Sequence, residues 1–201
     1  MDGRERELLG VVLIGAALAE LLAREGTAAQ LQRSLERAAP DTPPADLVPL
    51  AALLEDYLRR LPAALDALAA MAKTEGAGKS VAFVTGQALL YLVDEDDLFS
   101  EHELGSIGLV DDAYFVDRCI AALSTTFPGV APNETYRAPD PRTIAVVRSI
   151  LPPGVADALD RTADNLVRVA AALFAGNGGH NDAEPPLRPT LRVGEALASL
   201  I

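Results

Sequence analysis

The chain is poor in aromatic residues and in cysteine. It has no tryptophan, only 4% of its residues are aromatic, and its one cysteine is Cys119. A core without large rings must be filled by Ala, Leu and Val, which suits closely packed helices better than a sheet. A single cysteine cannot form an internal disulfide, which fits a reducing compartment or indifference to redox conditions. We therefore expect a cytoplasmic protein in which Cys119 is a small apolar residue of a helix.

Basic residues and long hydrophobic runs are also scarce. The 17 Lys and Arg residues are outnumbered by 29 Asp and Glu residues, and the net charge is −12. Nucleic acid and anionic lipid are usually bound by a basic patch, so we expect neither as a direct partner. The two apolar, uncharged runs Leu8 to Ala19 and Ser80 to Val93 have 12 and 14 residues. A membrane-spanning helix needs about 20, so the sequence predicts a soluble protein.

Motifs of catalysis and metal binding are missing. The two histidines, His102 and His180, are far apart in the sequence, and no paired cysteines accompany them, so a zinc site is not expected. The letters GKS at 78–80 lack the first glycine of a phosphate-binding loop, because Lys73 stands in its place. We interpret them as a turn in which Ser80 caps the next helix. No G-x-S-x-G sequence is present. We therefore predict no catalytic residue, no metal and no cofactor.

Apolar residues recur at helical spacing along most of the chain, and strand patterns are almost absent. The sequence predicts an all-α, multi-helix bundle with a buried central helical hairpin at about residues 80–123. We assign residues 1–175 to the bundle, and 176–201 to a linker followed by an amphipathic segment, Thr190 to Ile201, that docks on the bundle or on a second copy. The expected helices are Arg4–Arg24, Thr27–Ala39, one that Asp46 caps and Pro62 interrupts, a further one to about Met71, Val81–Val93, Asp112–Thr126, Arg142–Ile150 and Pro153–Ala175.

A strongly acidic connector joins the two helices of the predicted hairpin. Residues 94–117 carry nine carboxylates and no Lys or Arg, which is −9 of the net charge of −12. Some of this acidity has a structural explanation, because Asp111 or Asp112 can cap the helix that follows, after a sharp turn at Gly108. Asp94 to Asp97 instead follow the C-terminus of a helix, where each carboxylate is unfavourable by up to about 1 kcal/mol. The connector is therefore more acidic than helix capping requires.

This part of the sequence resembles a known family. An apolar helix ends in Tyr-Leu, an Asp-Leu pair and a second acid follow, and a glycine then precedes Asp-Asp at the start of another apolar helix. The pattern is similar to that of the YkvA-like family, a bacterial domain of unknown function, although acidic, serine and leucine residues stand where that family has prolines. The resemblance implies a helical hairpin with an acidic connector, and it implies no established activity. Its residues are Tyr91, Leu92, Asp97, Leu98, Glu101, Gly108, Asp111 and Asp112.

From these observations we predict a non-enzymatic helical interaction or scaffold module, an accessory component of a larger assembly. Its acidic connector is the candidate site for a protein partner with a basic surface, or for self-association. A solvated connector that binds nothing is one competing interpretation. Another is a divalent-cation-dependent, hydrolase-like enzyme that uses the acidic cluster, although no cationic side chain accompanies it. The candidate binding residues are Asp97, Glu101, Gly108, Asp111 and Asp112.

Overall fold

The computed structural model describes residues 15, 17–23, 27–92 and 108–174. Within these residues every regular element is a helix and there is no strand. The predicted all-α bundle is therefore confirmed. Residues 17–23 are helical, and the helices that follow are α2 (Ala28–Ala38), α3 (Pro44–Leu58), α4 (Leu61–Met71), α5 (Gly78–Leu92), α7 (Leu109–Thr126), α8 (Pro141–Ile150) and α9 (Val155–Phe174).

Proline and aspartate set several helix starts where the sequence places them. Pro62 lies in the first turn of α4, so the predicted interruption between α3 and α4 is confirmed. Pro141 opens α8 in the same way, because the N–H that proline lacks has no partner in a first helical turn. Asp140 caps α8 by accepting hydrogen bonds from the N–H groups of Arg142 and Thr143, at 2.9 and 3.1 Å. Hydrogen bonds from the Thr143 hydroxyl and backbone hold the pKa of the Asp140 carboxyl below its ordinary value.

The prediction that Asp46 caps α3 is wrong. The helix begins at Pro44, and Asp46 lies in its first turn. Pro44 has a φ angle already fixed near the helical value, so it starts the helix earlier than a capping side chain at position 46 would. As a result Pro49 lies inside α3 rather than in its first turn.

The prediction that Ser80 caps the helix after the glycine-rich turn is also wrong. The turn uses Gly76 at a φ of +81°, and α5 then begins at Gly78. Ser80 is therefore already inside the helix and is buried. Its hydroxyl donates a 3.2 Å hydrogen bond to the backbone carbonyl of Ala170, which joins α5 to α9.

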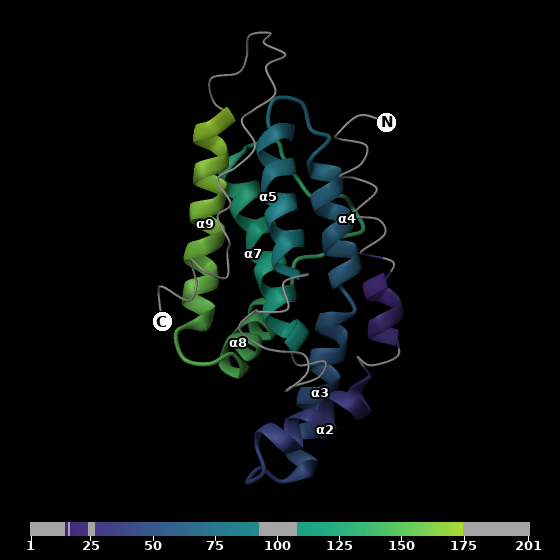
Figure 1. The fold of residues 1–201 in the computed structure, drawn as a ribbon. Coiled ribbons are helices and arrows are strands. Elements are labelled where there is room, and N and C mark those ends of the chain that lie inside the picture. Colours follow the sequence, from purple (N-terminus) through teal and green to yellow (C-terminus); the bar gives the residue numbers. More distant parts are fainter. Residues whose placement is uncertain (1–14, 16, 24–26, 93–107, 175–201) are drawn as a thin grey trace.

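Four helices, α4, α5, α7 and α9, lie side by side as the main bundle (Figure 1). In this view α9 and α4 are on the two sides, and α5 and α7 are between them, with α5 in front. The other helices, α2, α3 and α8, gather at the lower end. There α2 packs on α3, and α3 contacts both α7 and α8.

The two helices of the predicted hairpin both belong to the core, but they are not equally buried. Every residue of α7 from Leu109 to Asp117 is buried. Helix α5 buries one side, whereas Leu90 on its other side is 59% exposed. The difference arises because α7 contacts α3, α4, α5 and α9, while α5 has neighbours only on its inner side among the described helices. Polar side chains on α7 are therefore the ones that must find partners inside the protein.

Among the described helices, none combines the length and the apolar character that crossing a membrane requires.

Candidate functional site

The structure places three of the five predicted site residues, at the start of α7. Asp97 and Glu101 lie outside the described residues. Gly108 has φ −58° and ψ −20°, an ordinary helical conformation that any residue can adopt, so the backbone at this position does not require glycine. Asp111 and Asp112 are 0% and 1% exposed.

Neither aspartate caps α7, contrary to the prediction from the sequence. The helix begins at Leu109, and no side chain forms a cap hydrogen bond. Asp111 and Asp112 therefore fall within the first turn, where a carboxylate is still favoured by the positive end of the helix dipole. They point into the protein because α7 is surrounded by other helices at this level.

Asp111 is bound by the end of the preceding apolar helix. The Tyr91 hydroxyl on α5 donates a 2.8 Å hydrogen bond to Asp111 Oδ2. The Tyr91 ring packs on Phe115 of α7 with ring centroids 4.8 Å apart. Both tyrosine and aspartate are buried, so this hydrogen bond is shielded from water. It fixes the end of α5 against the start of α7, at the two points where the acidic connector leaves and returns.

The contribution of this hydrogen bond to the stability of the protein should be measurable. Tyr91→Phe keeps the ring packing but takes one donor away from a buried carboxylate, so we expect a loss of about 1.5 kcal/mol in unfolding free energy. Chemical denaturation of the variant and the wild type checks this value. The matched control is Thr125→Val, which removes an exposed hydroxyl from α7 and should change the unfolding free energy by less than about 0.5 kcal/mol. Equal stability of Tyr91→Phe and wild type would contradict the assignment.

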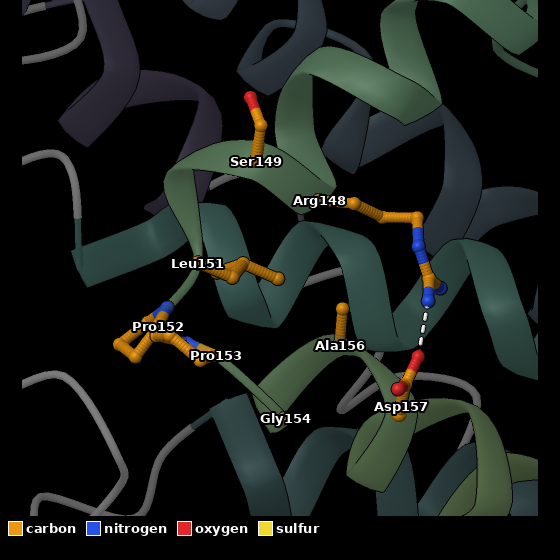
Figure 2. A pocket seen from close by; sticks show the side chains of 8 residues that line it. All are labelled: Arg148, Ser149, Leu151, Pro152, Pro153, Gly154, Ala156 and Asp157. Atoms are coloured by element: carbon orange, nitrogen blue, oxygen red, sulfur yellow. Dashed lines mark hydrogen bonds and ion pairs between the residues drawn. The ribbon is translucent and has the colours of Figure 1, made fainter.

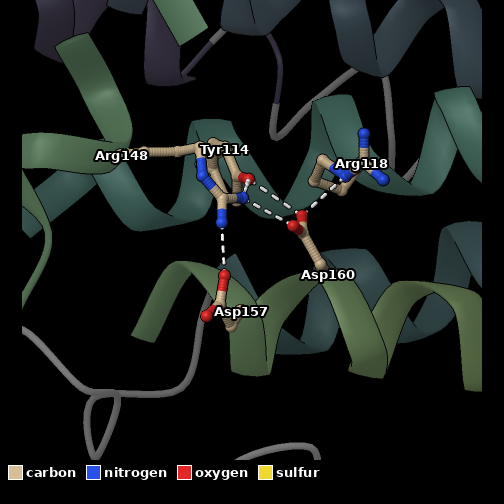
Figure 3. Close-up of polar contacts among 5 residues, drawn as sticks. All are labelled: Tyr114, Arg118, Arg148, Asp157 and Asp160. Carbon is tan, nitrogen blue, oxygen red and sulfur yellow. Dashed lines mark hydrogen bonds and ion pairs between the residues drawn. The ribbon is translucent and has the colours of Figure 1, made fainter. Parts of the chain in front are cut away.

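A second polar group joins α7, α8 and α9 (Figure 3). Asp160 of α9 accepts a hydrogen bond from the Tyr114 hydroxyl at 2.8 Å and one from Arg148 Nη1 at 2.5 Å. Arg118 Nε lies 2.7 Å from the same carboxylate as an ion pair. Arg148 also donates to the Tyr114 hydroxyl and, through its other terminal nitrogen, to Asp157. One carboxylate of α9 thus holds a phenol and a guanidinium group of α7 and a guanidinium group of α8.

The protonation states in this group are set by burial and by the ion pairs. Burial, and then the hydrogen bond to Asp160, raise the pKa of Tyr114 to about 12. The hydrogen bond to Asp160 raises the pKa of Arg148 further above its ordinary value. Tyr114 therefore stays protonated and Arg148 stays charged at neutral pH. Neither group is suited to exchange protons with a substrate.

A shallow depression lies beside this group, at the turn between α8 and α9 (Figure 2). Its volume is about 330 Å³. Arg148 and Asp157 at its edge are paired with each other, as the dashed line in Figure 2 shows. The rest of the lining is small or apolar: Ser149, Leu151, Pro152, Pro153, Gly154 and Ala156. The only charged groups of the depression are therefore already neutralised within the protein.

A third polar group surrounds Asp117, which is 9% exposed. Asp117 Oδ1 accepts a 2.7 Å hydrogen bond from the hydroxyl of Tyr136, in the irregular segment before α8. The Tyr57 hydroxyl of α3, fully buried, is close to the same carboxylate but lacks hydrogen-bond geometry, so only Tyr136 counts as a donor. Burial raises the pKa of Asp117, while Tyr136, Tyr57 and the guanidinium groups of Arg60 and Arg118 lower it by less.

The one cysteine of the chain, Cys119, is buried in α7. Burial raises the pKa of the Cys119 thiol, which keeps it protonated and unreactive. Within the described ranges, no group of three His, Cys, Asp or Glu side chains could hold a metal ion. The polar groups of α7 are arranged to hold helices together.

Sequence reasoning missed most of these contacts. All four tyrosines of the chain place their hydroxyls at an aspartate: Tyr91 at Asp111, Tyr114 at Asp160, and Tyr136 and Tyr57 near Asp117. One signal was available, because an aspartate such as Asp117 inside an apolar helical run must have a partner if it is buried. The identity of each partner depends on which helices become neighbours, which the spacing in the sequence does not give.

Comparison with known proteins adds nothing to this description: no family model, no curated protein and no solved structure matches the chain.

Proposed function

We propose that this protein is a non-enzymatic helical interaction module of the cytoplasm, an accessory component of a larger assembly, and that its acidic connector contacts a protein partner. The observation that carries the proposal is the buried hydrogen bond between Tyr91 and Asp111. It holds together the two helix ends from which the connector is presented. A segment whose ends are fixed loses less conformational entropy on binding than a free chain does.

The charge of the connector indicates the kind of partner. Residues 94–103 contain six carboxylates and no Lys or Arg. A concentration of like charge steers an oppositely charged surface toward it, so a basic protein surface is the expected partner. Asp111 and Asp112 are buried and act as supports for the connector. Direct contact with the partner therefore falls to acids such as Asp97 and Glu101.

The other polar groups support a binding role over a catalytic one. Asp160 of α9 and Arg148 of α8 are engaged with each other, and Asp117 is held by Tyr136. Groups that are saturated in this way stabilise the scaffold and leave little capacity for proton transfer. The YkvA-like pattern in residues 80–123 is compatible with such a hairpin, and it remains a prediction.

The test compares affinity capture from the native cell by three forms of the full chain. One is wild type, and one carries Asp94→Asn, Asp97→Asn and Glu101→Gln in the connector. The matched control neutralises the same number of exposed acids elsewhere, with Asp46→Asn, Asp56→Asn and Asp164→Asn. We expect a partner that wild type and control capture equally and that the connector variant loses by about tenfold or more, because steering by charge contributes to association.

Two results would count against the proposal. If all three forms capture the same proteins equally, the connector is not the contact site. If the connector variant and the control lose the partner together, net charge alone explains binding. Raising the salt concentration should weaken a true connector contact, because exposed charges are screened over about 8 Å at physiological ionic strength.

A further inference from the structure

One side of α5, opposite its buried residues, carries no charge after the exposed Lys79 of its first turn. Ala82 and Phe83 on this side also touch the core, and Leu90 is exposed. This α5 outer face consists of Ala82, Phe83, Gly86 and Leu90, which recur at helical spacing opposite the buried residues of the helix. From Ser80 to the end of α5 no residue is charged. In a protein of net charge −12, an uncharged helix side at the surface indicates a contact surface.

Gly86 points to the same conclusion independently. Glycine in the interior of a helix is destabilising relative to alanine, so its presence usually has a packing reason. A Cβ atom at Gly86 would meet no other atom within 4 Å, so the packing of the described residues does not require glycine there. Gly86 and Ala82, one turn earlier, form a strip of α5 without bulky side chains. Another backbone can approach α5 closely along this low strip.

The chain leaves α9 beside this surface. Phe174, the last residue of α9, packs edge-to-face on Phe83 of α5 with ring centroids 6.3 Å apart. Residues 175–189 then separate α9 from the segment Thr190 to Ile201. A glycine-rich chain of this length has a root-mean-square span of about 20 Å. Helix α5 is itself about 22 Å long, so the segment can reach the whole α5 outer face.

The contact area and the effective concentration indicate whether the α5 outer face binds this segment or a second copy of the protein. The side of one helix this long offers about 220 Å² of contact, whereas a stable interface needs about 800 Å² per partner. A second copy bound through α5 alone would therefore associate weakly. A tethered segment has an effective concentration in the millimolar range and does not lose the freedom of a separate molecule.

We propose that the α5 outer face is the docking site for the chain's own C-terminal segment, Thr190 to Ile201. Val193, Leu197 and Leu200 lie at the i, i+4 and i+7 positions of that segment, which is the spacing of one apolar helix face. Docking would cover Leu90 and bring the segment's backbone over Gly86. The proposal is independent of the acidic connector, so the two can fail separately.

Hydrogen exchange measured by mass spectrometry on the full chain tests the docking. We expect peptides from 190–201 to exchange about tenfold or more slowly than the same sequence as a free peptide. Leu90→Glu should bring their exchange close to the free-peptide rate, because it places a charge on the face. The matched control is Val48→Glu, which changes a residue of similar exposure on α3, 50% against 59%, and should leave the exchange unchanged.

A second variant separates loss of docking from loss of folding. Gly86→Gln raises the low strip on α5 with an uncharged side chain, and it should also release the segment while α4, α7 and α9 keep their wild-type exchange. The proposal is overturned if residues 190–201 exchange like a free peptide in wild type, or if neither variant changes their exchange. Protection that appears only at concentrations where sedimentation detects a dimer would also overturn it, because the occupant would be a second copy.

Discussion

Asp117→Ala is expected to lower the free energy of unfolding by about 2–3 kcal/mol. The variant removes the acceptor of the Tyr136 hydroxyl and leaves the Arg60 guanidinium and the Tyr57 hydroxyl facing an apolar side chain. Losing these interactions costs more free energy than is gained by no longer burying a carboxylate. Denaturation with urea measures the difference, and hydrogen exchange in residues 127–140 should show where the structure loosens.

Asp117→Asn is the matched control, because asparagine keeps an oxygen that accepts from Tyr136 but has no charge. We expect it to differ from wild type by less than about 1 kcal/mol at neutral pH. If Asp117→Ala and Asp117→Asn are equally destabilised, the charge and not the acceptor is what stabilises this group. If neither is destabilised, Asp117 does not hold the segment before α8.

The difference in stability between wild type and Asp117→Asn should also depend on pH. Burial raises the pKa of Asp117 above its ordinary value of 3.8, so between that value and the raised pKa the folded state binds a proton that the unfolded state does not. The associated stability is complete below about 3.8 and is lost as the pH rises through the folded-state pKa. The stability of wild type relative to Asp117→Asn should therefore increase as the pH is lowered from 7 toward 4.

The sequence predicted the helices better than it predicted their polar contacts, for a physical reason. Helix bounds depend on local signals such as Pro62 and the glycine-rich turn at 76–78, and those two signals acted as expected, whereas the Asp140 cap was not predicted. Where two local signals competed, as at Pro44 and Asp46, the one that fixes the backbone earlier set the boundary.

The candidate site was only partly predictable, because burial depends on neighbouring helices. Asp111 and Asp112 read as capping residues in the sequence, since a pair of aspartates before an apolar run is a common helix start. Their burial follows from the position of α7 in the middle of the bundle, which no local pattern encodes. Asp160 and Arg148 gave no local signal either, because exposed helix sides usually carry such charges.

Asp160→Ala is the second variant with a large expected effect, a loss of about 2 kcal/mol in unfolding free energy. Asp160 is 26% exposed and contacts Tyr114, Arg118 and Arg148, so its hydrogen bonds to charged groups are partly shielded from water. The loss of such bonds lies in the range of about 1.5–3 kcal/mol, and the partial exposure of both arginines places it in the lower half.

The matched control for this variant is Asp157→Ala, which removes another carboxylate from the same arginine. Asp157 is 62% exposed, so its ion pair with Arg148 should contribute less than about 1 kcal/mol. Helix α8 itself buries only Val147, and the Asp160 contacts are therefore a main attachment of α8 to the bundle. Hydrogen exchange in α8 should accelerate in Asp160→Ala and stay near wild type in Asp157→Ala. Equal effects of the two substitutions would mean that Asp160 contributes no more than a surface ion pair.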